Sequence, residues 1–287
     1  MKILKTLCLL AFAAVMPAML TSCDDDDEPS SSASSSSSSY SGPYFGLRDC
    51  GKVISSIRGL GIFDDKPLSF VYDESGRVVE VKVGSLGTVS YDYNSLTGKD
   101  VSNGFVGKSE FHANANGRFN CLTRVYSWGK DAYEFKYNSD GNVISVVQTY
   151  SAELYGISWC CTYTFIWDGD LLTSVSWTTK DEDVSTSDAE MKITYSDDDN
   201  KYRTPLCGLT TMMFHELLYP NELSIAPAKL PKKIECYVQG GQGEGEYEYA
   251  CRYTLDDEGF IESEYIEDNA DGEDYADIRY TYADKEF

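Results

Sequence analysis

Four segments of this chain repeat one short pattern, and the pattern constrains the fold more than any other feature. The segments read "FVYDESGRVVEV" (70–81), "FKYNSDGNVISV" (135–146), "YTLDDEGFIESE" (253–264) and, in shortened form, "FIWDGDLLTSV" (165–175). Each begins with two large residues spaced by two, which lie on one face of a strand. Asp or Asn follows, and then a glycine that can adopt the positive φ of a tight turn. Each segment is therefore predicted to form a β-hairpin.

Further strands are predicted between these hairpins, because other segments are rich in β-branched and aromatic residues. They span 52–57, 88–93, 122–128, 158–166, 174–179, 191–195, 233–239, 247–253 and 278–282. Closely spaced strands and turns favour an all-β domain, an antiparallel meander of twisted β-hairpins. The segment 205–222 differs, since Leu206, Leu209, Met213 and Leu217 have helical spacing between two prolines. It is predicted to form one short helix packed on a sheet face.

The amino end has the layout of an export signal. Residues 1–22 carry Lys2, Lys5 and an apolar run too short to span a bilayer comfortably. Residues 20–23, Leu-Thr-Ser-Cys, resemble the lipobox of bacterial lipoproteins, which implies lipidation of Cys23 and attachment to a membrane. The alternative is an ordinary secretory signal with an incidental cysteine. Residues 23–43 hold an acidic block and a serine tract that predicts a flexible linker, and 44–287 form a single β-rich domain.

The acidic block Asp24 to Asp27 bears on the location. It resembles the signal that sends lipoproteins of Bacteroidota to the outer face of the outer membrane, so we expect an outer-membrane lipoprotein exposed at the cell surface. In enterobacterial lipoproteins, by contrast, an aspartate after the cysteine tends to mean retention at the inner membrane. Display toward the periplasm, or a charge run that only stays solvated, are the other interpretations.

Charge narrows the range of partners. The chain has 24 basic and 47 acidic residues and a formal net charge of −23. Nucleic-acid binding needs a basic face for phosphate contacts, so this composition argues against it. Cations, basic partners and neutral ligands remain compatible with it.

Cysteines and histidines offer little chemistry. Seven of the nine cysteines lie after Cys23, and Cys236 and Cys251 flank a glycine-rich turn, where a symmetric hairpin would place them for a possible disulfide. No CxxC or zinc-type spacing occurs. We interpret His112, in a predicted loop, and His215, in the predicted helix, as structural. No cofactor is expected.

One acidic segment invites comparison with a calcium site. "EDNADGED" (267–274) places Glu267, Asn269, Asp271 and Gly272 like the start of an EF-hand loop. Ile278 occupies the position where that loop needs its bidentate glutamate. We interpret the segment as an acidic hairpin turn and predict no metal.

Aromatic residues are the remaining candidates for ligand binding. The chain has 22 tyrosines and four tryptophans, and a row of rings on a solvated sheet face could stack on sugars. Trp128, Trp159, Trp167 and Trp177 are therefore candidate ligand-binding residues. The alternative is that they form cross-strand aromatic pairs that hold the sheet together.

The hairpins resemble the tyrosine-aspartate (YD) repeats of Rhs-type proteins, and the whole arrangement is similar to Bacteroidota lipoproteins with the uncharacterised domain DUF4595. The resemblance rests on Cys23 with its acidic block, on the repeated hairpins, and on "NKYRTPLCGL" (200–209) followed by "AKLPKKI" (228–234). Lys229 departs from the asparagine usual there. The resemblance implies a fold and a location, and it brings no catalytic or ligand residues.

These observations predict a non-enzymatic binding or interaction module with a polysaccharide or another surface protein as ligand. One alternative is a glycoside hydrolase that uses two carboxylates, because such chemistry needs only a correctly spaced pair. The other is a purely structural component of the cell envelope.

Overall fold

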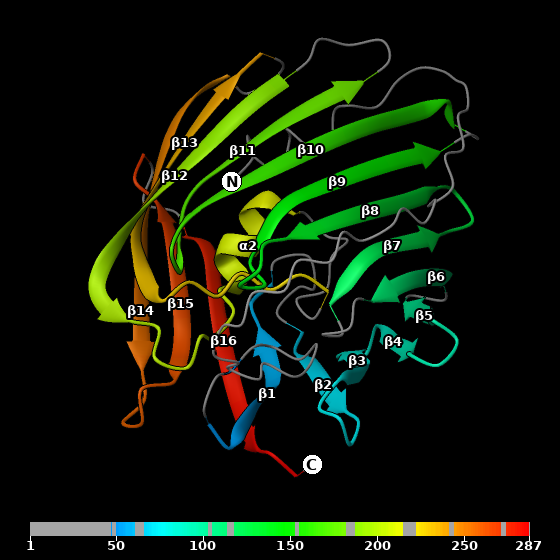
Figure 1. The fold of residues 1–287 in the computed structure, drawn as a ribbon, viewed down its shortest axis with the longest axis horizontal. Coiled ribbons are helices and arrows are strands. Elements are labelled where there is room, and N and C mark those ends of the chain that lie inside the picture. Colours follow the sequence, from blue (N-terminus) through cyan, green and yellow to red (C-terminus); the bar gives the residue numbers. More distant parts are fainter. Residues whose placement is uncertain are drawn as a thin grey trace, which may run out of the picture.

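In the computed structural model, sixteen strands form one closed barrel around a short helix (Figure 1). The structure describes residues 47, 50–60, 66–102, 105–113, 118–152, 155–181, 187–214, 222–240, 244–270 and 274–286. The predicted signal peptide, Cys23 and the linker lie outside these residues. No helix in the described part of the chain is long and apolar enough to span a membrane.

The strands are β1 (Lys52–Arg58), β2 (Leu68–Tyr72), β3 (Val78–Val83), β4 (Gly87–Asp92), β5 (Thr97–Ser102), β6 (Phe105–Ala113), β7 (Phe119–Val125), β8 (Lys130–Tyr137), β9 (Val143–Ala152), β10 (Ile157–Asp168), β11 (Leu171–Asp181), β12 (Ser187–Asp199), β13 (Lys229–Gln239), β14 (Gly245–Leu255), β15 (Ile261–Asp268) and β16 (Asp274–Asp284). The helix is α2 (Cys207–Met213).

Each strand pairs antiparallel with the next one in the sequence, so the predicted all-β meander is confirmed. The meander also closes on itself. β1 pairs antiparallel with β16, with Ile54 opposite Tyr282 and Ile57 opposite Tyr280. Closure gives the first and last strands a partner on both sides, which protects their edges from pairing with other chains. A closed barrel is more specific than the twisted meander predicted from the sequence.

The four repeated hairpins all turn at the same end of the barrel. They join β2 to β3, β8 to β9, β10 to β11 and β14 to β15, and an antiparallel meander places every even-to-odd connection at one end. Their glycines have positive φ, as predicted: 78° at Gly76 and Gly141, 56° at Gly169 and 90° at Gly259. We call this end the repeat end and the opposite one the far end. β1 begins and β16 finishes at the repeat end.

The second large residue of the repeat has a structural role. A β-bulge precedes it in all four hairpins, which re-aims its side chain. In three of them its tyrosine hydroxyl or indole N–H then donates a hydrogen bond to a backbone carbonyl of the preceding strand. Equivalent bonds form from tyrosines in, or directly after, three other even-numbered strands. The donors and acceptors are Tyr72 to Ile54, Tyr93 to Val78, Tyr137 to Phe119, Trp167 to Val143, Tyr195 to Leu172 and Tyr282 to Ile261, at 2.6–3.1 Å.

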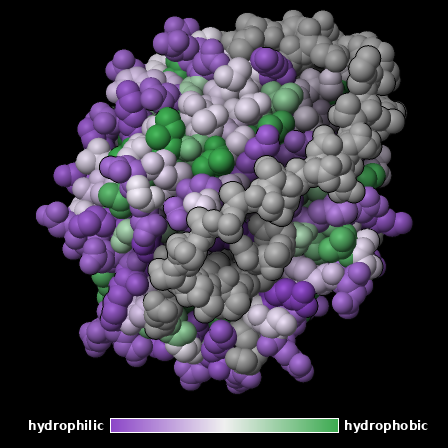
Figure 2. Space-filling view, viewed as in Figure 1, coloured by the Kyte–Doolittle hydropathy of each residue, from purple (hydrophilic) through white to green (hydrophobic). Residues whose placement is uncertain are grey.

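The barrel wall is apolar inside and polar outside. Along β10, Cys161, Tyr163 and Phe165 are buried, whereas the intervening Thr162 and Thr164 are exposed. Charged residues face outward from neighbouring strands, and Lys233 forms ion pairs with Glu235 at 3.1 Å and Glu248 at 3.4 Å. On the face in Figure 2 the described residues are mainly hydrophilic, with small separate groups of hydrophobic ones.

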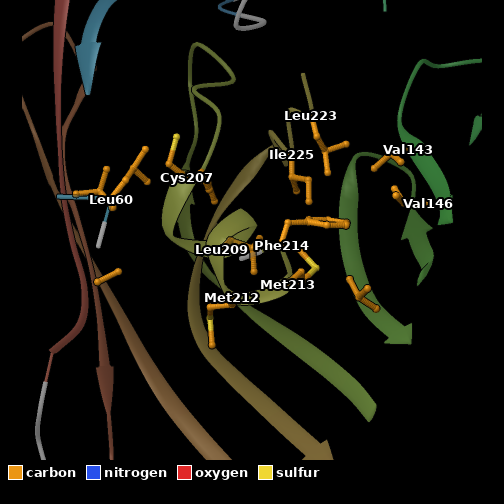
Figure 3. Close-up of a cluster of buried hydrophobic side chains, with 14 of the residues drawn as sticks. Leu60, Val143, Val146, Cys207, Leu209, Met212, Met213, Phe214, Leu223 and Ile225 are labelled. Atoms are coloured by element: carbon orange, nitrogen blue, oxygen red, sulfur yellow. The ribbon is translucent and has the colours of Figure 1, made fainter. Parts of the chain in front are cut away.

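The connection between β12 and β13 fills the interior. We call its described residues, 200–214 and 222–228, the plug. Its helix α2 is buried on nearly all sides and packs near β15 and β16. The plug side chains that join the barrel core are Leu206, Cys207, Leu209, Met212, Met213, Phe214, Leu223 and Ile225 (Figure 3). The helix predicted within 205–222 is confirmed as the shorter α2, and it packs on the inner face of the sheet.

Candidate functional site

A carboxylate of the wall fixes the plug helix. The side chain of Glu264, on β15, is completely buried. It accepts hydrogen bonds from the backbone N–H of Gly208 at 3.0 Å and from the Tyr280 hydroxyl at 2.7 Å. A Cβ on Gly208 would lie only 3.0 Å from the Glu264 carboxyl carbon, so the glycine permits this approach. Burial raises the pKa of Glu264 to about 6, opposed by these hydrogen bonds.

A second carboxylate belongs to the plug and is held by the wall. Arg124 on β7 forms a buried ion pair with Glu222, in which the two side chains are 4% and 1% exposed. The hydroxyl of Tyr91, on β4, donates to the same carboxylate at 2.7 Å. Burying two charges is costly unless they are paired and hydrogen-bonded, as these are. The plug is therefore latched to the wall at two places, through Glu264 and through Glu222.

Arg124 belongs to a row of inward-facing residues that crosses several strands. Residues directly opposite in an antiparallel sheet share a face. Arg124 is opposite Asp131, Asp131 is opposite Tyr150, and Tyr150 is opposite Trp159. In the other direction Arg124 is opposite Ser109. We call these five residues the polar row. It interrupts the apolar lining of the barrel on β6 to β10.

Asp131 is the unusual member of this row. The residue is 1% exposed, and neither carboxylate oxygen has a hydrogen-bond partner in the part of the chain that the structure describes. Burial raises the pKa of Asp131 to about 6, and only the nearby charge of Arg124 opposes that change. Buried polar atoms are nearly always hydrogen-bonded, so two orphaned oxygens on one carboxylate mark the position as a candidate ligand site.

The predicted tryptophan platform is not assembled on an outer face. Trp159, Trp167 and Trp177 are partly buried and pack against the interior core, because their strand positions face inward. Trp167 belongs to the aromatic hydrogen bonds at the repeat end. Trp177 stacks on Tyr163 with ring centroids 6.1 Å apart, and Trp159 on Tyr150 at 5.8 Å. Trp128 alone is exposed, at 40%, in the turn between β7 and β8, where it stacks on Tyr126.

The structure does not join Cys236 to Cys251. Both thiols are free, and Cys236 is opposite Tyr247. The hairpin is not symmetric about its glycine-rich turn, so Cys251 is displaced along β14 from the position that was expected. Burial raises the pKa of Cys236 to about 11 and of Cys251 to about 12, which keeps both thiols protonated.

Two further expectations concern histidine and calcium. His112 is exposed on β6 and does not lie in a loop, because the strand continues to Ala113. His215 lies outside the described residues. In the acidic turn, Glu267 pairs with Arg252, and the Asn269 amide donates to Glu248 at 2.7 Å. Asp271 and Gly272 are not among the described residues. No group of three potential metal ligands occurs in the part of the chain that the structure describes.

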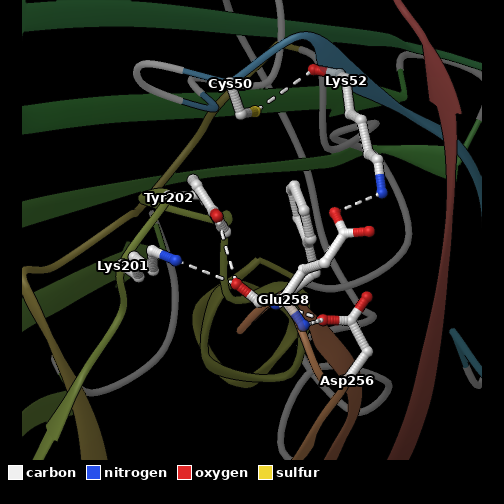
Figure 4. A network of polar contacts seen from close by, with 7 residues as sticks. Cys50, Lys52, Lys201, Tyr202, Asp256 and Glu258 are labelled. Carbon is white, nitrogen blue, oxygen red and sulfur yellow. Dashed lines mark hydrogen bonds and ion pairs between the residues drawn. The ribbon is translucent and has the colours of Figure 1, made fainter.

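The repeat end carries its own polar network (Figure 4). Glu258, in the turn between β14 and β15, pairs with Lys52 at 2.7 Å. The backbone carbonyl of Glu258 accepts hydrogen bonds from Lys201 at 3.0 Å and from Tyr202 at 3.1 Å. Tyr202 also stacks on Phe260 at 4.1 Å. These contacts join the first strand, the start of the plug and a repeated hairpin.

The buried charges were not singled out from the sequence, although strand alternation contained a signal for two of them. In "KDAYEFKY" (130–137), Asp131 has the same parity as the large residues Tyr133 and Phe135. In "FNCLTRV" (119–125), Arg124 has the parity of Leu122. A charge in register with the core positions of a strand is unexpected and therefore informative.

Comparison with known proteins supports the fold alone. No family model matches the chain, and no curated protein matches it. A crystal structure of a porin-like protein from Bacteroides uniformis ATCC 8492 is similar, with 16% identity and a TM-score of 0.54, over 80% of this chain and 96% of that one. A porin-like protein from Bacteroides vulgatus ATCC 8482 has 12% identity and a TM-score of 0.49, over 80% and 98% of the two chains. The chain therefore has the architecture of a β-barrel similar to that of a porin-like protein.

Proposed function

We propose that this chain is a non-catalytic binding module, a filled β-barrel that stands in water and is tethered to the bacterial outer membrane through a lipid on Cys23. The observation that carries the proposal is the polarity of the wall. A transmembrane barrel presents an apolar band to lipid and a polar interior. Here the apolar side chains face inward, and the outer face carries ion pairs such as Lys233 with Glu235.

The plug supports a binding role over a transport role. Its apolar side chains join the core, and Glu264 and Glu222 latch it to the wall. Opening a water-filled path would break these contacts and expose buried apolar surface. The ligand, a polysaccharide or another surface protein, is expected to bind at the surface or at the far end.

Measurements on the Cys23→Ala variant and on the natural chain test this proposal. The full-length Cys23→Ala variant, which carries no lipid, should stay in solution without detergent and produce no conductance steps in planar bilayers. The natural chain should incorporate labelled palmitate and be digested by protease added to intact cells. A variant that needs detergent, or stepwise conductance, would contradict the water-exposed barrel. Protection from protease would favour display toward the periplasm.

A glycoside hydrolase that uses a carboxylate pair is the second candidate. The pKa of Asp131 is raised by burial, as a general acid requires, while the carboxylate of Glu222 is held by Arg124 beside it. Both side chains are buried, which weighs against access by a sugar chain. Hydrolysis of any glycan in a panel that disappears in both Asp131→Asn and Glu222→Gln would establish this activity and overturn the non-catalytic proposal.

A further inference from the structure

We propose that Asp131 is the ion-pairing group of a binding site for an organic ammonium ion, placed inside the barrel near its far end. The inference deepens the proposed binding function by naming a ligand class, and it rests on that function. The ammonium group belongs either to a small amine or to a lysine side chain of a protein partner.

The carboxylate of Asp131 is buried without compensation from the described residues. Its two oxygens are buried and accept no hydrogen bond. An unpaired carboxylate in such surroundings requires donors or a positive charge. Glu264 shows the usual solution in the same barrel, since it is also fully buried and accepts bonds from Gly208 and Tyr280. Asp131 lacks this compensation.

The buried charges around Asp131 do not balance. Among the described residues, the buried charged side chains around the polar row are Arg124, Glu222 and Asp131. Arg124 donates to both oxygens of Glu222, which forms an ion pair with it. One negative charge, that of Asp131, is left over. A neutral sugar would leave that charge uncompensated, whereas one ammonium ion balances it and offers three donors to the two oxygens.

Two aromatic rings lie beside the carboxylate of Asp131. Tyr150 is directly opposite Asp131 and stacks on Trp159, with ring planes 26° apart. Burial and the charge of Asp131 both raise the pKa of Tyr150, which keeps its hydroxyl protonated. Aromatic faces attract organic cations through their quadrupoles. A carboxylate next to a Tyr–Trp stack therefore offers both interactions that recognise an ammonium group.

Asp131 lies near the far end of the barrel. Asp131 is the second residue of β8, so only Lys130 and the turn before it separate the carboxylate from the far end. Trp128 in that turn is 40% exposed. The carboxylate is therefore close to the far end in sequence, and it lies at the opposite end of the barrel from the Glu258 network.

The test uses the full-length Cys23→Ala chain and small probes matched in shape. Propylammonium is titrated against tryptophan fluorescence and the thermal midpoint, and neutral propanol and glucose are titrated in parallel. We expect saturable binding of propylammonium alone. Asp131→Asn should weaken that binding at least tenfold. Glu134→Gln, which removes an exposed carboxylate from the outer face of the same strand, should leave binding unchanged within twofold.

A second arm distinguishes the sources of the ammonium group. Spermidine and a short lysine-containing peptide are compared with the peptide in which the lysine is acetylated. Tighter binding of spermidine assigns a small amine, and tighter binding of the unmodified peptide assigns a protein partner.

Several results would overturn the inference. Equal binding of propylammonium and propanol would do so, as would saturable binding of glucose or full affinity in Asp131→Asn. Absence of any binding would indicate that a buried water satisfies the carboxylate. The proposed function fails separately, on lipidation, detergent dependence or conductance, none of which depends on Asp131.

Discussion

The carboxylate of Glu264 accepts a hydrogen bond from the backbone N–H of Gly208 at 3.0 Å, and this contact joins the barrel wall to its plug. Replacing Glu264 with Gln keeps one acceptor but places an amide N–H₂ where donors converge. We expect the free energy of unfolding to fall by about 1–3 kcal/mol at pH 7.5, where the carboxylate is ionised. Chemical denaturation monitored by near-UV circular dichroism measures it. Glu262→Gln, an exposed change two residues earlier, is the control.

Acidity should stabilise this protein over part of the pH range. Burial raises the pKa of Asp131 and of Glu264 to about 6, above the 3.8 and 4.5 of free carboxyls. A carboxyl group whose pKa is higher in the folded than in the unfolded state stabilises the fold when it is protonated. This stabilisation is complete below the pKa of the unfolded state and is lost as the pH rises through the pKa of the folded state. The free energy of unfolding should therefore decrease by a few kcal/mol, on the order of 2–4, between pH 4.5 and pH 7.5. A curve that rises over this range would contradict the assignment.

Asp131→Asn should flatten part of that pH dependence. It removes the buried charge without removing any hydrogen bond, because the carboxylate oxygens have no partner. We expect the variant to be more stable than the natural chain by about 1–3 kcal/mol at pH 7.5, and nearly equal to it at pH 4.5. Thermal melts at the two pH values provide the comparison. Destabilisation at pH 7.5 would mean that the carboxylate has a partner.

Substitutions of Arg124 and Glu222 should have strongly non-additive effects on the free energy of unfolding. Arg124→Met leaves the Glu222 carboxylate buried without its counter-charge, which typically costs about 3–5 kcal/mol. The double variant Arg124→Met with Glu222→Gln removes both charges and should recover most of that loss. A double-mutant cycle from urea denaturation measures the coupling. Additive effects of the two substitutions would indicate that the latch does not form in solution.

The aromatic hydrogen bonds at the repeat end allow a matched test. Tyr137→Phe removes only the hydroxyl that donates to the Phe119 carbonyl at 3.0 Å, and should cost about 1 kcal/mol. Tyr253→Phe is the control, because no backbone carbonyl of the described residues accepts from its buried hydroxyl and the other three repeats carry Phe at that position. It should be neutral or slightly stabilising. Equal losses in both variants would point to packing as the cause.

Local features of this fold were predictable from the sequence. The hairpin turns follow from Asp or Asn before a glycine, and Gly76, Gly141, Gly169 and Gly259 have the positive φ that this chemistry requires. The helix also followed from the spacing of Leu206, Leu209 and Met213. These signals span a few residues each, so the sequence displays them directly.

Barrel closure was not predictable in the same way. The pairing of Ile54 with Tyr282 joins residues more than two hundred positions apart, and no local pattern encodes it. The inward orientation of Trp159, Trp167 and Trp177 was not predictable for a related reason. Whether Trp159 faces water or the core depends on which side of the sheet becomes the interior, and the strand pattern alone does not determine that side. The burial of Glu222 became visible only when the wall and the plug were brought together, whereas Asp131 already shares the parity of Tyr133 and Phe135.

The seam between β1 and β16 has a consequence for how the chain is made. β1 pairs with β2 on one side, and its other edge stays open until β16, which contains Tyr282, has joined it. Open edges pair readily with other chains and lead to aggregation. Truncation within β16 should therefore leave the second edge of β1 open and turn a stable product into an aggregating one.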